Sequence, residues 1–92
     1  MARGVTRMSL DNCAGTVLTP PQSTVFANGA LVAVLGTGIA AHAPCPVIPI
    51  HCGPSMSSCS FDVFAEGVGI CRKGDSCSCG HTSSGSPDVM VN

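Results

Sequence analysis

Apolar and polar residues alternate in three short segments of the chain that are similar to one another. The segments are STVFANG at 23–29, SFDVFAEG at 60–67 and SPDVMVN at 86–92. Each begins with a small polar residue, continues through valine and a larger apolar residue, and closes at Asn, Asn-Gly or Glu-Gly. This alternation predicts a short strand that enters a tight turn. Since one short strand cannot bury an apolar face alone, three copies predict repeated units packed around a common axis.

Two of these segments are followed by a second apolar run, which predicts the returning strand of a hairpin. Residues 30–35 (ALVAVL) follow the Asn28-Gly29 turn, and residues 68–73 (VGICRK) follow the Glu66-Gly67 turn. The near-continuous apolar character of 30–35 indicates burial on both faces or contact with a partner. We expect the third segment to form a strand over 88–91, and residues 1–19 to form a leading strand and loop.

A proline-rich stretch separates the first two segments. Residues 44–54 contain four prolines, and proline is confined to the edges, bulges and turns of sheets. We therefore expect an extended connector there and no central strand. Glycine and proline recur along the whole chain and exclude long helices. The pattern predicts one small all-β domain over 1–92, whose limited core would benefit from a covalent or metal staple.

Charged side chains are sparse, and this excludes some classes of partner. The chain has four Lys and Arg and five Asp and Glu, a net charge of −1. Without a basic patch to follow phosphates, nucleic acid is not expected as a partner. A surface with so few charges is instead typical of one partly covered by another protein. We expect no signal peptide, because polar residues follow Met1, and no transmembrane helix, because glycine and polar residues interrupt the apolar run 27–43.

Cysteine and histidine are the residues with candidate chemistry. Seven cysteines without a secretion signal favour metal ligation with free thiols over a disulfide framework. All three histidines, His42, His51 and His81, lie in cysteine-rich surroundings, which predicts a metal site. The densest cluster of ligand-type residues is 77–81 (CSCGH). None of the five acidic residues stands in a His-Glu-type motif, so we do not expect an enzyme.

The order of these motifs resembles the PAAR-repeat family. The matching segments are Gly74-Asp75 with 79–81 (CGH), and GSPDVMVN at 85–92; degenerate copies are 25–29 with 33–37, and 62–67. Members of that family form the spike tips of contractile injection systems in phage tails and type VI secretion. Two departures stand out: Thr37 occupies the place of the family's Asp, and LVAV at 31–34 replaces the Pro-Ala-Ala-Arg signature. The length is similar to that of small phage-type members.

The resemblance implies a fold and a role. The fold would be a small cone of short β-hairpins with pseudo-threefold repeats around a metal near the apex. One copy would cap a trimeric β-helical spike, at the tip of a virion tail baseplate or secreted through an injection machine, and would contact the target membrane transiently. The broad base would be built from residues 30–35 and 68–71. The alternative is a free-standing small zinc-binding or thiol-redox module that uses Cys71, Cys77 and Cys79.

The resemblance also implies a structural metal, with zinc as the expected ion and iron as an alternative. Carried over by position, its ligands would be His42, His51 and Cys79, completed by either Cys13 or His81. Four protein ligands would leave no open position for catalysis. Cys45 and Cys52 would be able to compete for the metal, and Cys71 is expected to fill the core.

Overall fold

The computed structural model describes residues 2–92 and shows a small, mostly β protein. The strands are β1 (Arg3–Gly4), β2 (Asn12–Cys13), β3 (Gly15–Thr16), β4 (Phe26–Ala27), β5 (Ala30–Leu31), β6 (Phe64–Ala65), β7 (Val68–Gly69) and β8 (Met90–Val91). One 3-10 turn, η1 (Pro49–His51), is present, and residues 2–92 contain no α-helix. Within the same residues, no helix is long and apolar enough to cross a membrane. The expected small β protein with short antiparallel hairpins is confirmed.

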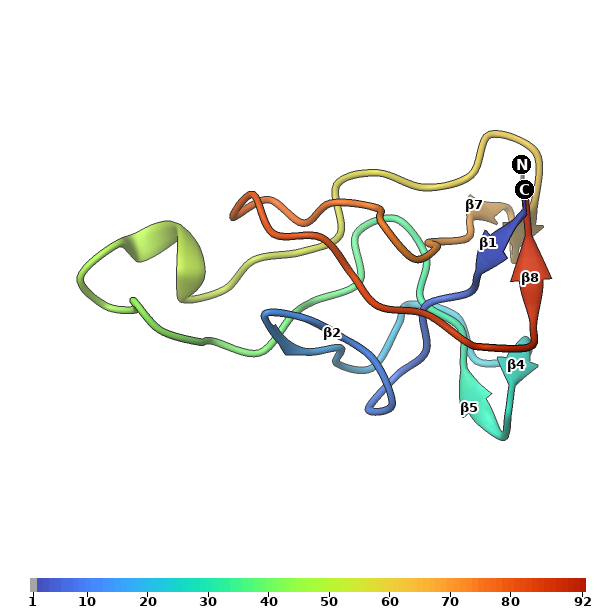
Figure 1. The fold of residues 1–92 in the computed structure, drawn as a ribbon, viewed down its shortest axis with the longest axis horizontal. Coiled ribbons are helices and arrows are strands. Elements are labelled where there is room, and N and C mark those ends of the chain that lie inside the picture. Colours follow the sequence, from blue (N-terminus) through green and yellow to red (C-terminus); the bar gives the residue numbers. More distant parts are fainter. Residues whose placement is uncertain (1) are drawn as a thin grey trace.

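Three antiparallel strand pairs gather at one end of the elongated molecule, at the right of Figure 1. They are β4–β5, β6–β7 and β8–β1, and each contains one of the three similar sequence segments. Asn28-Gly29 and Glu66-Gly67 have positive φ at both positions, the geometry of a tight hairpin turn. The third segment pairs with the start of the chain, a pairing the sequence pattern did not predict; Met1, part of the expected leading strand, lies outside the described residues.

Three backbone hydrogen bonds form a closed ring that joins distant parts of the chain. The N–H of Thr6 donates to the Cys71 carbonyl at 3.0 Å. The N–H of Cys71 donates to the Ala33 carbonyl at 2.9 Å, and that of Ala33 returns to Thr6 at 2.8 Å. All three residues are fully buried. The ring accounts for the burial of residues 32–34 within the apolar run 30–35: only Ala30 and Leu31 belong to a hairpin ladder, and the residues after them cross to other segments, while Leu35 is exposed.

The three segments share one turn design at their polar starts. A side-chain oxygen of Gln22, Ser60 or Ser86 accepts hydrogen bonds from the two backbone N–H groups that lie two and three residues later. Such local side-chain bonds fix a turn before the strand begins. Gln22 directly precedes the first segment, whereas Ser60 and Ser86 open the other two, so a polar residue at the start of each repeat has a direct structural role.

The apolar core has two parts. The part at the hairpin end consists of Val5, Ala27, Val32, Val34, Ala65 and Ile70. The central part consists of Cys13, Val17, Ala33, Ile39, Met56, Cys71, Cys77 and Cys79. Cys71 is fully buried, as expected of a core residue. Because residues 32–34 and 70–71 are buried within the molecule, they are not available for the broad base expected at 30–35 and 68–71.

The proline-rich connector forms the opposite end of the molecule (left in Figure 1). It is not wholly extended, because residues 49–51 form the 3-10 turn η1. Cys45 and Cys52 are joined by a disulfide, with their Cα atoms 5.1 Å apart. The expectation that both remain free thiols, able to compete for a metal, was therefore wrong. The fold of this loop, and not the number of cysteines in the chain, decides which two of them meet.

Candidate metal centre

Four of the five proposed ligands meet in one cluster. The side chains of His42, His51, Cys79 and His81 each offer a ligand atom, and these atoms lie within 4.8 Å of one another. Nε2 of His42 is 3.0 Å from Nδ1 of His51 and 3.6 Å from Sγ of Cys79. In a tetrahedral zinc site with bonds of 2.0–2.3 Å, ligand atoms are separated by roughly 3.3–3.8 Å. The donor set and its spacing fit a metal ion after small side-chain adjustments.

Two separate turns bring the ligands together. His51 ends η1, where its N–H donates to the Ile48 carbonyl, and its own carbonyl accepts from the N–H of His42 at 3.1 Å. Cys79 and His81 lie on the second turn, a tight one in which Gly80 has φ +93°. In this turn the N–H of Gly80 donates to the Cys77 carbonyl, and the N–H of Cys77 donates to the His81 carbonyl. An ion held by all four side chains would tie the proline-rich connector to the turn 77–81.

The protonation states favour metal binding. Nδ1 of His42 lies 3.0 Å from the Ala40 carbonyl, which can only accept, so Nδ1 carries the proton and Nε2 presents a lone pair to the cluster. Burial, together with the neighbouring imidazoles of His42 and His81, lowers the pKa of His51. His51 is therefore neutral at pH 7, the form in which a histidine binds metal.

Gly15 is a residue of this site that the sequence analysis missed. A Cβ atom there would overlap the Ala40 carbonyl oxygen and come within 2.8 Å of Nδ1 of His42. Only glycine lets β3 approach the hydrogen bond between Nδ1 of His42 and the Ala40 carbonyl, which orients the imidazole. Glycine is frequent throughout the chain, so no local signal distinguished this one.

Cys13 lies beside the cluster and is not part of it. Its side chain is fully buried, and Sγ donates a hydrogen bond to the His81 carbonyl at 3.3 Å. Burial, together with the nearby Cys77 thiol, raises the pKa of Cys13 to about 12. Of the two alternatives for the fourth ligand, His81 belongs to the cluster, whereas Sγ of Cys13 contacts the backbone carbonyl of His81.

Cys77 is a further thiol close to the cluster, with Sγ 3.0 Å from Sγ of Cys79. Burial acts to raise the pKa of Cys77, but hydrogen bonds with Cys13 and Cys79 outweigh it, and the pKa is lowered. Cys45 and Cys52, paired with each other, offer no thiolate. The four clustered side chains are enough to fill a tetrahedral coordination shell.

No protein-family model matches the chain, and no curated protein matches its sequence. The function is therefore argued from the fold and the cluster.

Proposed function

We propose that this protein is the tip of the central spike of a contractile injection machine, either a phage tail or a type VI-like system. A single copy caps the end of a trimeric β-helical spike and leads it toward the target membrane. It sits at the tail baseplate or is secreted through the machine. A structural metal stabilises the narrow end. The role is mechanical and involves no catalysis.

The observation that carries the proposal is the closed hydrogen-bond ring of Thr6, Ala33 and Cys71. Each residue donates to one neighbour and accepts from the other, as expected at a pseudo-threefold axis. The three strand pairs and the three polar turns repeat around the same ring. A single chain with three similar faces can meet the three identical chain ends of a trimer, which supports the cone with pseudo-threefold repeats.

The hairpin end offers a surface suited to the spike. Phe26, Phe64 and Met90 stand at corresponding places on β4, β6 and β8, and 58%, 56% and 48% of their surfaces are exposed. An isolated protein gains nothing from three large apolar side chains in water, whereas covering them stabilises a complex. These residues replace the expected base residues as the proposed contact with the trimer.

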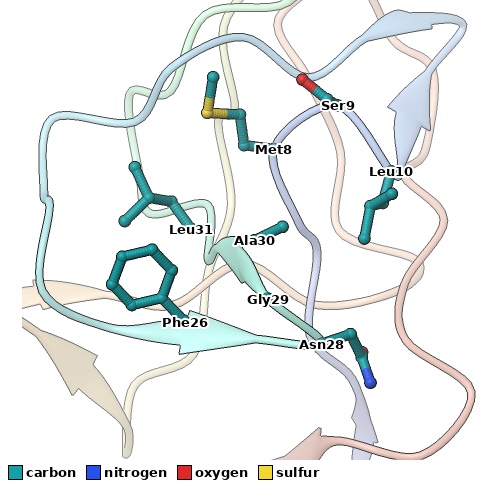
Figure 2. A pocket seen from close by; sticks show the side chains of 8 residues that line it. All are labelled: Met8, Ser9, Leu10, Phe26, Asn28, Gly29, Ala30 and Leu31. Atoms are coloured by element: carbon teal, nitrogen blue, oxygen red, sulfur yellow. The ribbon is translucent and has the colours of Figure 1, made fainter.

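A pocket beside β4 and β5 adds to this surface. It is lined by Met8, Ser9, Leu10, Phe26, Asn28, Gly29, Ala30 and Leu31. Figure 2 shows the side chains of Met8, Phe26 and Leu31 grouped along the hairpin. The pocket is mostly apolar, so we propose that it receives an apolar side chain from the end of one spike chain.

The polar rim of the hairpin end also follows the threefold pattern. Each of its contacts joins one segment's closing residue to the start of another segment. Asn28 bonds to Ser86 and Asp88, Glu66 bonds to Ser23 and Thr24, and the Asn92 carbonyl accepts from Ser60. These contacts hold the three strand pairs in fixed positions, as a flat cap on a trimer requires.

The opposite end is suited to a structural metal. There the molecule narrows to the proline-rich connector, and a narrow tip has little apolar volume to bury. The His42, His51, Cys79 and His81 cluster lies beside this end, so a bound ion would replace the missing core. Three imidazoles and one thiolate suit zinc, and iron is the alternative.

The direct test is capture by a spike. The protein is mixed with trimeric β-helical spike fragments, and any complex is weighed by native mass spectrometry. We expect one chain per trimer. Phe26→Ser with Phe64→Ser should abolish the complex, while Val47→Ser, at the other end, should leave it intact. A protein that stays monomeric with every such fragment is not a spike tip.

The second candidate function is a thiol-redox module, and the 3.0 Å approach of Cys77 to Cys79 is the observation that favours it. Such a module would catalyse disulfide reduction in a model substrate and lose that activity with Cys77→Ser. A spike tip would show no turnover, and this assay separates the two functions.

A further inference from the structure

The end of the molecule opposite the hairpins exposes a group of aliphatic side chains. Residues 43–52, here called the tip loop, contain Val47, Ile48 and Ile50, whose surfaces are 84%, 46% and 56% exposed. Figure 1 shows this loop, with η1, at the extremity of the long axis, which measures 35 Å. The rest of residues 2–92 leaves about half or more of each of these side chains uncovered, so this apolar surface is free to meet something else.

The tip loop contains no charged side chain that would have to be dehydrated in lipid or that would attract charged headgroups. No Asp, Glu, Lys or Arg occurs between Asp11 and Asp62. The one titratable side chain in the loop outside the disulfide is His51, which is buried and turned toward the metal cluster. Entry into hydrocarbon therefore carries no cost for desolvating an ion. Equally, there is no basic residue in the loop to bind anionic headgroups.

The backbone of the tip loop is also prepared for an apolar environment. Pro44, Pro46 and Pro49 have no N–H group. Four further N–H groups, those of Cys45, Ile48, His51 and Cys52, donate to carbonyls within residues 42–49. Unsatisfied backbone N–H and C=O groups make irregular backbone costly in lipid. In this loop, proline or an internal hydrogen bond accounts for most of the N–H groups.

These same features argue against a protein partner for the loop. Protein interfaces rely on aromatic and arginine side chains at their centres, and neither type occurs in residues 43–52. A strand-pairing partner would need a row of free backbone N–H groups, and proline and internal bonds have removed most of these. Aliphatic side chains on a closed, charge-free loop match the acyl region of a bilayer better.

We propose that the tip loop inserts into the hydrocarbon region of a lipid bilayer through Val47, Ile48 and Ile50, independently of headgroup charge. The Cys45–Cys52 disulfide keeps the loop closed, so that its aliphatic side chains face outward while His51 faces the cluster. This inference deepens the proposed function and rests on it for its biological setting. It names the surface and the lipid component that membrane contact would use.

Vesicle flotation tests it directly. The purified protein is mixed with vesicles of phosphatidylcholine alone and with vesicles containing about one third phosphatidylglycerol. We expect equal binding to both. Val47→Ser with Ile50→Ser should lower the partition coefficient about tenfold or more, since two aliphatic side chains no longer enter lipid. Phe61→Ser removes a side chain that is 90% exposed outside the loop and should have no effect. Binding only to anionic vesicles, or equal losses in both variants, would overturn the proposal.

A second measurement, of tryptophan fluorescence, reports how deeply the tip loop enters the bilayer. The chain has no tryptophan, so Val47→Trp and Phe61→Trp each introduce a single fluorophore. Brominated acyl chains should quench the first and spare the second; the reverse contradicts insertion by the loop.

Cys45→Ser with Cys52→Ser should reduce binding several-fold, and unchanged binding would refute the need for closure. If the protein caps the spike but does not bind vesicles, this inference alone is refuted. If it binds vesicles but no spike, only the proposed role as a spike cap is refuted.

Discussion

Asp75 accepts hydrogen bonds from both the backbone N–H and the guanidinium Nε of Arg72, at 2.8 and 3.0 Å. Asp11 holds Arg7 in the same way, at 2.8 Å for each bond. In the remaining repeat, Thr37 Oγ1 accepts from the N–H of Val34 at 3.0 Å. Where valine replaces arginine, the turn still needs an acceptor for its N–H but no longer needs a carboxylate. This explains why Thr37 stands where the motif has Asp.

Removal of the Asp75 carboxylate should destabilise the protein strongly. Asp75 is 4% exposed and also contacts Arg3 and Ser58, so Asp75→Ala would leave Arg72 without its partner. Because the arginines are partly solvated, we expect a loss of about 2–4 kcal/mol in the free energy of unfolding. Urea unfolding measures it. Asp62→Ala, an exposed acidic residue, is the control and should change stability by less than about 0.5 kcal/mol. Similar losses in both variants would contradict this role.

Acid should unfold the protein through the same carboxylates. Burial acts to raise the pKa of Asp11 and Asp75, but hydrogen bonds from Arg7 and Arg72 outweigh it and hold both values below the ordinary 3.8. The unfolded chain therefore binds more protons, and stability falls as the pH drops from about 5 toward the folded-state values. Melting temperatures between pH 6 and pH 2.5 measure this. A flat profile, or a flatter one in wild type than in Asp75→Asn, would refute the assignment.

Metal binding should require His81 and tolerate loss of Cys13. Protein purified without added metal should carry one ion per chain by elemental mass spectrometry. His81→Ala and Cys79→Ser should lose it, whereas Cys13→Ser should retain it despite a cost to the core, because its Sγ bonds to a carbonyl and lies outside the cluster. Chelation should lower the melting temperature of the wild type by about 10 °C or more. Metal loss in Cys13→Ser alone would restore Cys13 as the fourth ligand.

Local turn chemistry is what made part of this fold predictable. Asn28-Gly29 and Glu66-Gly67 lie at the hairpin turns they were expected to form, because few residue pairs adopt positive φ twice in succession. The cysteine-rich surroundings of the three histidines predicted a metal site, and the structure contains a His and Cys cluster that could hold an ion. For the hairpin turns, the signal lies within a few residues of the feature.

Long-range geometry was not readable from the sequence. The pairing of β1 with β8, the Cys45–Cys52 disulfide and the approach of Gly15 to His42 each depend on contacts between distant segments or on a turn inside an irregular loop. The broad base expected at 30–35 and 68–71 depends on long-range packing in the same way, since residues 32–34 and 70–71 are buried against other segments of the chain. An apolar run reports burial, but it does not report whether the cover is another segment of the chain or a partner.

Gly4 should be essential to the closure of β1 on β8. A Cβ atom at this position would overlap the carbonyl oxygen of Ser86, which is backbone and cannot move aside. Gly4→Ala should therefore cost about 1–3 kcal/mol in the free energy of unfolding, as overpacking does elsewhere. Gly53→Ala is the matched control, since its Cβ meets nothing within 4 Å. Denaturant midpoints of the two variants give the comparison. If the two are equally stable, the third strand pair is not held as closely as the structure shows.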